Sequence, residues 1–345
     1  MTRVLVTGHA GFIGFHVAKR LLAEGHDVVG VDSVNAYYDP SLKRARLAQI
    51  ESVERMRSFE FDIADQATLE EAFAAASPEV VIHLAAQAGV RYSIDHPSSY
   101  MSSNLVGTFN LLEAARAYPV RHFMLASSSS VYGMNAKVPF SERDRADEPV
   151  SLYAATKKAT ETLAHSYAHL YAIPTTAFRF FTVYGPWGRP DMALFKFVRA
   201  MEVGDPIDVY GEGRMIRDFT YIDDLVESIV RLSNVVPMVG APVGAEDSLS
   251  PVAPFRTVNL GGGSPVGLLD FIEAIEAATG KKSSRNLLPM QPGDVVQTSA
   301  DPTLLRTLIG NTPNTPVATG VTEFVRWWRS YRSTYVAGED SELPH

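Results

Sequence analysis

Short apolar runs alternate with longer stretches of helical periodicity along the first 180 residues of the chain. This alternation predicts a parallel sheet with helices on both faces, because strands buried on both faces are apolar throughout instead of at every second position. The predicted strands cover residues 4–6, 28–31, 59–61, 80–84, 123–126 and 175–178. The predicted helices cover residues 15–24, 102–117 and 154–172. The pattern therefore predicts an α/β fold with a doubly wound parallel sheet.

The pattern changes after residue 180. Proline and glycine become frequent, as in residues 185–190, and the alternation of strands and helices is lost. We therefore predict a large domain over residues 1–180, to which some later segments return, and a smaller C-terminal α/β cap over 181–335. The cap would bind the substrate and supply the second wall of a cleft, and residues 336–345 would form a flexible polar tail.

The chain of 345 residues has a formal net charge of −8 and contains no cysteine. The acidic balance argues against nucleic acid or an anionic membrane as the main partner, since both are bound by basic surfaces. A cysteine nucleophile, a disulfide and a cysteine zinc site are excluded, and we expect no metal site. The N-terminus shows no cleavage site, and no apolar run approaches the roughly 20 residues of a membrane span. We expect a cytoplasmic protein.

A glycine-rich segment follows the first predicted strand and opens the first helical region, with Gly8, Gly11 and Gly14 at every third position. Glycines there permit a tight turn and a close approach of pyrophosphate to the backbone, while the helix N-terminus binds the phosphates. Asp32, which follows the second predicted strand, suits a ribose 2′-hydroxyl and repels a 2′-phosphate. The segment therefore predicts a Rossmann-type site for NAD, with a plain tight turn as the alternative.

Two residues with the chemistry of a proton-transfer site lie at the start of the predicted helix 154–172, one directly before it and one in its first turn. Tyr153 and Lys157 are four positions apart, so their side chains share a face. A tyrosine with a pKa near 10 is a poor base at neutral pH, but a nearby ammonium and a positive nicotinamide ring stabilise its phenolate. Tyr153 would take the proton of a substrate hydroxyl, and Ser128 would hydrogen-bond the same oxygen. An exposed helix face that carries Tyr and Lys is the alternative.

The glycine segment, the serine run 127–133 and the segment 153–157 occur in the order found in the extended short-chain dehydrogenase/reductases, which the chain resembles over roughly residues 1–330. The resemblance places the catalytic serine at Ser128, with Ser129 and Ser130 in the pocket. Asp62 would contact the adenine edge, with a helix N-cap as its alternative role. Further cofactor-binding residues implied are Phe12, Ile13, Asn35, Ile63, Leu84, Ala85, Ala86, Gln87, Asn104, Phe180 and Val183.

Within this superfamily, segments 88–93, 179–193, 213–221 and 290–295 are similar to the UDP-glucuronate 4-epimerases. The resemblance implies that Arg189 and Thr182 bind the sugar carboxylate. Arg217 is a candidate for the diphosphate, because guanidinium groups match phosphate oxygens. Further substrate contacts are expected at Arg91, Met192, Tyr210, Gln291 and Asp294, the last two at the uridine ribose or against Arg217. A surface salt bridge is the alternative for each arginine.

The resemblance implies C4 oxidation of UDP-glucuronate with NAD, rotation of the 4-keto sugar and re-reduction to UDP-galacturonate. In related 4,6-dehydratases an Asp-Glu pair follows the catalytic residue, and in the decarboxylases a Glu lies two residues after it. Here Ser129 and Ser130 stand at those positions, which disfavours elimination and assisted decarboxylation. An epimerase of UDP-glucose or UDP-N-acetylglucosamine is one alternative, and a catalytically silent NAD-sensing regulator is another. The two long helices, 102–117 and 154–172, would form a homodimer interface, with core packing as the alternative.

Overall fold

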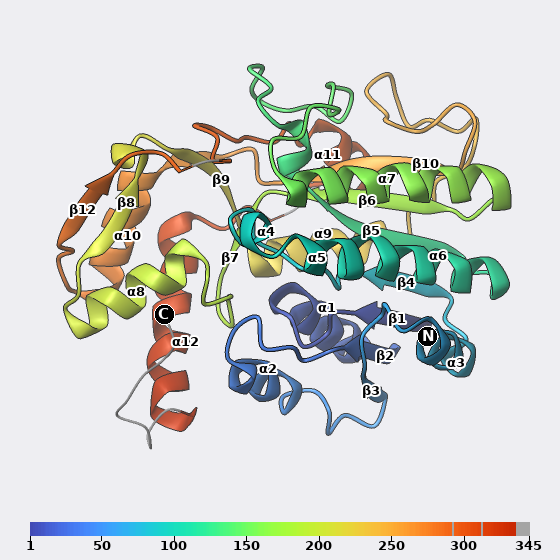
Figure 1. Cartoon of the computed structure of the whole chain (residues 1–345), viewed down its shortest axis with the longest axis horizontal. Coiled ribbons are helices and arrows are strands. Elements are labelled where there is room, and N and C mark those ends of the chain that lie inside the picture. The colour runs from blue at the N-terminus through green and yellow to red at the C-terminus, as the bar shows by residue number, and fades with distance from the viewer. Residues whose placement is uncertain (292, 312, 336–345) are drawn as a thin grey trace.

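A parallel sheet of seven strands forms the centre of the computed structural model, which describes residues 1–291, 293–311 and 313–335 (Figure 1). Its strands are β1 (Arg3–Thr7), β2 (Asp27–Asp32), β3 (Met56–Glu60), β4 (Val80–His83), β5 (His122–Ser128), β6 (Thr175–Phe180) and β10 (Phe255–Leu260). They lie in the order β10-β6-β5-β4-β1-β2-β3, and all neighbouring pairs are parallel. The order reverses between β1 and β4, which is where such sheets bind ligands.

Helices cover both faces of this sheet, because side chains along each strand alternate between two apolar clusters. In β1, Val4 and Val6 pack on one face and Leu5 on the other. The first face is covered by α1 (Phe12–Ala23), α2 (Pro40–Leu47), α9 (Ile222–Leu232) and α11 (Thr303–Ile309). The second face is covered by α3 (Gln66–Ala76), α6 (Gly107–Ala117) and α7 (Leu152–Tyr171). The predicted Rossmann-type doubly wound sheet is confirmed.

Three predicted element boundaries were wrong. The third strand is Met56–Glu60 instead of 59–61, so Asp62 lies two residues beyond its end. The first helix begins at Phe12 instead of residue 15, so that its first turn lies within the glycine segment and Gly11 is its N-cap. The predicted helix 102–117 starts as a π-helix, η1 (Met101–Val106), and becomes α-helical only at Gly107. Short helices α4 (Tyr92–Asp95) and α5 (Pro97–Tyr100) precede it.

The expectation that strands and helices stop alternating after residue 180 was also wrong. Short strands form two small sheets, of order β11-β9-β7 and β12-β8, to one side of the large sheet (Figure 1). Strands of three to six residues between prolines and glycines carry too little periodicity to be recognised. The further elements after residue 180 are β7 (Thr182–Tyr184), α8 (Ala193–Val203), β8 (Ile207–Tyr210), the 3₁₀ turn η3 (Gly211–Gly213), β9 (Ile216–Tyr221), β11 (Pro265–Gly267), α10 (Leu268–Thr279), β12 (Arg285–Leu288) and α12 (Val317–Tyr335). Another 3₁₀ turn, η2 (Ser129–Tyr132), follows β5.

The C-terminal part shares its apolar core with the large sheet. Phe195, Phe271 and Trp328 belong to the same cluster as Phe15 and Val6. Segments after residue 180 also belong to the large sheet and its helical layer. Strand β10 forms one edge of the sheet, and α9 and α11 pack on one of its faces. The division at residue 180 stays a prediction, and the predicted tail 336–345 lies outside the described residues. Because the C-terminal part shares its apolar core with the large sheet, its fold depends on packing against that sheet.

Candidate active site

The glycine segment forms one wall of a cleft at the carboxyl ends of β1, β2 and β4. Gly8 has φ +76°, and a Cβ there would lie 2.8 Å from the backbone nitrogen of Ala85. A Cβ at Gly14 would lie 2.1 Å from the carbonyl oxygen of Gly8. Only glycine permits these approaches, and they bring the N-terminus of α1 to the cleft. The wall therefore fits a dinucleotide whose pyrophosphate lies against the first turn of α1.

Asp32 lies at the end of β2 and lines this cleft. Its carboxylate accepts hydrogen bonds from the backbone N–H groups of Ala10 (3.1 Å) and Val34 (2.8 Å), which fixes both loops beside it. Lys43 faces the same region and donates to the backbone and side-chain oxygens of Asn35, each at 2.9 Å. Burial lowers the pKa of Lys43, and Asp32 opposes that shift. Lys43 is a cleft residue that the sequence did not reveal.

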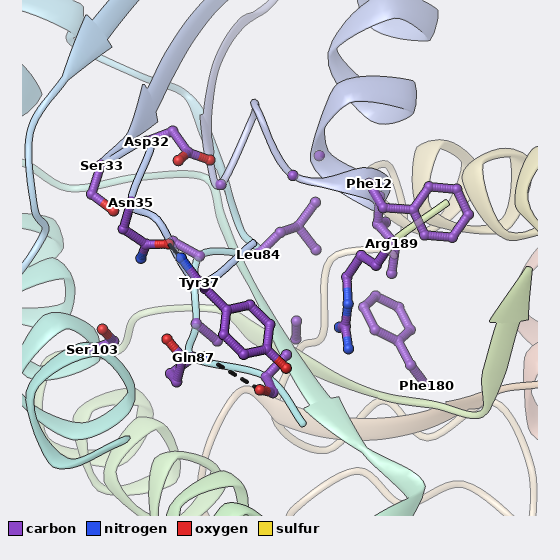
Figure 2. A pocket seen from close by; sticks show the side chains of 18 of the residues that line it. Phe12, Asp32, Ser33, Asn35, Tyr37, Leu84, Gln87, Ser103, Phe180 and Arg189 are labelled. Carbon is purple, nitrogen blue, oxygen red and sulfur yellow. Dashed lines mark hydrogen bonds between the residues drawn. The ribbon is translucent and has the colours of Figure 1, made fainter. Parts of the chain in front are cut away.

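The predicted cofactor residues lie along this cleft, with one exception. Those that line it are Gly8, Gly11, Phe12, Ile13, Gly14, Asp32, Asn35, Asp62, Ile63, Leu84, Ala85, Ala86, Gln87, Tyr153, Lys157, Phe180 and Val183 (Figure 2). Asn104 lies behind the wall, where its amide bonds both backbone groups of Gln87 and the hydroxyl of Thr156. These hydrogen bonds hold the wall in place, and the predicted contact of Asn104 with the cofactor stays a prediction. Asp62 lines the cleft and also caps the turn at Ala64.

Tyr153 and Lys157 lie side by side at the start of α7, as predicted. The Lys157 ammonium is buried and donates to the carbonyl of Ala126 at 2.9 Å. Burial lowers the pKa of Lys157 to about 8, and the Glu161 carboxylate opposes this. Burial raises the pKa of Tyr153, and the groups that oppose it are Ser128 and Arg189. Ser128 and Arg189 thus favour the phenolate against the larger effect of burial. That Lys157 lowers the pKa of Tyr153 stays a prediction.

The first two serines of the run differ in where their hydroxyl groups point. Ser127 donates its hydroxyl to Glu161 at 2.6 Å, so its side chain is committed to the interior. Ser128 lines both the cofactor cleft and the adjoining cavity, and it donates to the hydroxyl of Ser130 at 3.1 Å. Successive residues of a strand point in opposite directions. This geometry supports Ser128 as the serine that meets a substrate.

A second cavity adjoins the cofactor cleft, and Ser128, Tyr153, Phe180, Arg189 and Met192 line both. Predicted substrate residues on its wall are Ser128, Ser129, Ser130, Tyr153, Thr182, Arg189, Met192, Arg217 and Asp294. Three other predicted substrate residues lie beside the cavity and are not among its lining residues: Arg91, Tyr210 and Gln291. A ligand in this cavity would meet the cofactor at Tyr153.

Arg217 and Arg91 differ in their surroundings. Arg217 is largely buried and donates to the carbonyls of Ile216 and Val296, and burial lowers its pKa. Asp294, expected against Arg217 or a ribose, pairs with Arg91 at 2.9 Å and also acts on Arg217, whose pKa its charge raises against the effect of burial. Its contact with a ribose stays a prediction. The Arg91 guanidinium also lies 4.6 Å from the centre of the Tyr210 ring. The structure thus shows the salt bridge that was the alternative role for Arg91. A contact of Arg91 with substrate stays a prediction.

Arg189 stands where the two cavities meet. Its guanidinium is paired with Asp191 through two contacts, Nε to Oδ1 at 3.0 Å and Nη2 to Oδ2 at 2.6 Å. This pairing uses one edge of the planar guanidinium and leaves Nη1 for a further partner. Asp191 and its neighbour Tyr37 were not found from the sequence. The long loop between β2 and α2, at the carboxyl end of a strand, was the available signal for Tyr37.

Among the described residues, no group of His, Cys, Asp and Glu is arranged to hold a metal ion. No helix in the same part of the chain is long and apolar enough to cross a membrane.

The two cavities, which share a wall at Ser128 and Tyr153, define a dinucleotide-dependent enzyme with a Tyr–Lys–Ser site on a Rossmann-type sheet. The chain belongs to the NAD dependent epimerase/dehydratase family, which it matches over residues 4–237. It is 59% identical to a probable UDP-glucuronate 4-epimerase of Rhizobium meliloti, over 96% of this chain and 99% of that protein.

Two further similarities extend this comparison. UDP-glucuronate 4-epimerase 4 of Arabidopsis thaliana is 47% identical over 96% of this chain and 76% of its own length. The crystal structure of a Bacillus cereus UDP-glucuronic acid 4-epimerase in complex with UDP-glucuronic acid and NAD superposes with a TM-score of 0.84. Its sequence identity is 32%, and the match covers 95% of this chain and 99% of that one. The predicted family and fold are confirmed.

Proposed function

We propose that this protein is an NAD-dependent UDP-glucuronate 4-epimerase, which interconverts UDP-glucuronate and UDP-galacturonate. The observation that carries the proposal is the position of Arg189, which lines both cavities beside Tyr153. A partly buried guanidinium with a free edge is the group that best matches a sugar carboxylate. Thr182 lines the same cavity and offers a hydroxyl donor. The similarity to curated and crystallised UDP-glucuronate 4-epimerases supports this assignment.

The residues of the site have separate roles in this reaction. Bound NAD supplies the hydride acceptor for oxidation at C4 and the donor for the return. Tyr153 accepts the proton of the 4-hydroxyl, while Ser128 hydrogen-bonds the same oxygen. Arg217 holds the diphosphate as the 4-keto sugar turns, so that the opposite face of C4 would receive the hydride on its return. Tyr153 then returns the proton to the 4-oxygen. Protons and hydride balance, so the reaction consumes no cofactor.

The residues that line the substrate cavity also bear on the alternatives. Ser129 and Ser130 line it where a dehydratase needs acidic side chains, and hydroxyl groups do not replace carboxylic acids in elimination. An epimerase of UDP-glucose or UDP-N-acetylglucosamine would have no use for a cation at C6. A silent regulator would not require Tyr153, Lys157 and Ser128 together on the wall of one cleft.

A side-by-side product assay tests the proposal. UDP-glucuronate, UDP-glucose and UDP-N-acetylglucosamine are incubated with the enzyme and NAD, and the products are separated by chromatography. We expect kcat/KM for UDP-glucuronate to exceed the others by at least about 100-fold, because a C6 carboxylate makes a charge-assisted contact with the Arg189 guanidinium that a neutral C6 group cannot make. Turnover of the neutral sugars alone would falsify the assignment.

Arg189→Ala should raise KM for UDP-glucuronate about tenfold or more, since a charged hydrogen-bonded contact is lost. The 4-keto intermediate is a β-keto acid, and a carboxylate that Arg189 and Thr182 no longer hold can align its C–CO2 bond with the carbonyl. We therefore also expect UDP-pentose among the products of this variant. An unchanged preference for the uronate sugar would contradict the role of Arg189.

We also propose a cytoplasmic homodimer in which η1, α6 and α7 form the interface. Met101, Val106 and Phe109 are apolar and 42–47% exposed on η1 and α6, which lie beside α7 (Figure 1). Val106→Glu should shift the protein from dimer to monomer in sedimentation velocity, because a charge in an apolar interface is not solvated. Lys19→Glu, on the opposite face of the sheet, is the control for added charge. A wild-type monomer at micromolar concentration would contradict the proposal.

A further inference from the structure

A hydrogen bond between two side chains joins the loops after β2 and β7 beside the cofactor cleft, and Arg46 of α2 also donates to the carbonyls of Trp187 and Gly188. Tyr37 lies in the loop after β2, and Asp191 lies in the loop after β7, 154 positions later. The Tyr37 hydroxyl donates to Oδ2 of Asp191 at 3.2 Å. Figure 2 shows the Tyr37 ring lying across the pocket, with Asn35 and Asp32 on one side and Arg189 and Phe180 on the other. A dinucleotide in this cleft would pass beneath or beside this connection.

The surrounding chain holds the Tyr37 ring and leaves room for its hydroxyl. The ring contacts Tyr38 and Tyr92, with ring centres 5.9 and 4.8 Å away. Gly89 has φ +99°, and a Cβ there would lie 2.7 Å from the Tyr37 hydroxyl oxygen. Any other residue at position 89 would push the hydroxyl away from Asp191 or strain the backbone. The position of the hydroxyl is therefore fixed from three sides.

Asp191 is a strong acceptor for this hydrogen bond. Its Oδ2 receives both the Tyr37 hydroxyl and Nη2 of Arg189, and its Oδ1 receives Nε of Arg189. Burial acts to raise the pKa of Asp191, but Arg189 and Tyr37 keep it below the ordinary value, so the group is charged. Hydrogen bonds to an ionised acceptor are stronger than those between neutral groups. The same carboxylate thus ties the cofactor-side loop to the arginine that faces the substrate.

We propose that Tyr37 and Asp191 form a clasp that retains NAD in its cleft, and that Asp191 also positions Arg189 toward the substrate. The need for retention rests on the proposed function. Hydride taken from C4 has to return to the same sugar, so a reduced cofactor that left early would strand the 4-keto sugar. A hydrogen bond between the two walls slows that loss, because the loops must separate before the dinucleotide can leave.

Release of NAD without any sugar present is the direct test of the clasp. Protein loaded with NAD is isolated by gel filtration and diluted into an enzymatic trap for free NAD, and the release rate is followed. Tyr37→Phe should release NAD about tenfold faster, because a hydrogen bond to a charged acceptor is lost without loss of the ring. Tyr92→Phe is the matched control: it removes a hydroxyl from the neighbouring ring and should leave the release rate unchanged.

Asp191→Asn separates the two roles. It weakens the Arg189 pair, so KM for UDP-glucuronate should rise several-fold with a smaller effect on kcat, as expected for a positioning residue. A double variant with Tyr37→Phe should release NAD no faster than the faster single variant, because both act on one interaction. Gly89→Ala, which displaces the hydroxyl from the other side, should also speed release.

Equal release rates for wild type, Tyr37→Phe and Gly89→Ala would overturn the clasp. Circular dichroism and the melting temperature establish that each variant is folded. Because release is measured without sugar, it tests the clasp independently of which sugar the enzyme epimerises. A failed product assay with accelerated release would overturn the proposed function and leave the clasp standing.

Discussion

Replacing Tyr153 by Phe is expected to lower kcat by about 10²–10⁴-fold, the usual contribution of a positioned acid–base group. The substitution removes only the hydroxyl, so it creates no large cavity in the wall that the two binding sites share. NAD content and melting temperature should therefore stay at wild-type values. Steady-state turnover of UDP-glucuronate, followed by chromatography of the products, provides the measurement.

Two comparisons make this prediction specific. Ser128→Ala should also slow turnover, because Ser128 lines both cavities, whereas Ser127→Ala should leave kcat nearly unchanged because its hydroxyl is bound to Glu161. A Tyr153→Phe variant with wild-type turnover would show that another group moves the proton. An unaltered biological effect of that variant, in cells that need the protein, would revive the regulatory alternative.

Arg179→Met is expected to lower the free energy of unfolding by about 3–5 kcal/mol, because it leaves the buried Glu161 carboxylate with only the longer contact to Lys158, at 3.4 Å, as an ion pair. Both side chains of the Arg179–Glu161 pair are only 3% exposed, and two contacts of 2.9 Å join them. The Arg179 guanidinium also lies 4.8 Å from the centre of the Tyr132 ring. Equilibrium unfolding in urea, monitored by circular dichroism, gives the midpoint and its slope.

The double variant Arg179→Met/Glu161→Gln is the control for this effect. It removes the charge that the single variant leaves without Arg179, so a substantial part of the lost stability should return. Ser127→Ala, which removes one hydrogen bond to the same carboxylate, should cost about 1 kcal/mol. A single variant with the wild-type midpoint would mean that water or another residue compensates the Glu161 charge.

Local sequence was enough to predict the first half of the fold. Strands buried on both faces are apolar throughout, and the glycine segment between β1 and α1 has one common structural reading. Tyr153 and Lys157 were predictable as a pair because four residues of helix bring two side chains to one face. The strands after residue 180 were missed, since their partners are distant in sequence and each is too short to show a period.

Contacts of site residues with partners distant in the sequence escaped prediction. Asn104 was predicted to contact the cofactor, and in the structure its amide hydrogen-bonds Gln87 and Thr156 behind the cleft wall. Asp294 pairs with Arg91, 203 positions away, and Tyr37 with Asp191. No spacing rule connects such pairs, because their separation is set by how the loops meet at the end of the sheet.

The sequence by itself determined the fold class and the type of cofactor, because the glycine segment, Asp32 and the Tyr–Lys pair are local patterns. The sugar substrate was implied by the family resemblance. The sequence also supplied the arginines that an anionic substrate needs, despite a net charge of −8. The tertiary structure decided which serine hydroxyl is bound to buried Glu161, which arginine keeps a free edge, and which loops are joined across the cleft. Those choices depend on side-chain direction and on burial, which arise only when segments distant in the chain pack together.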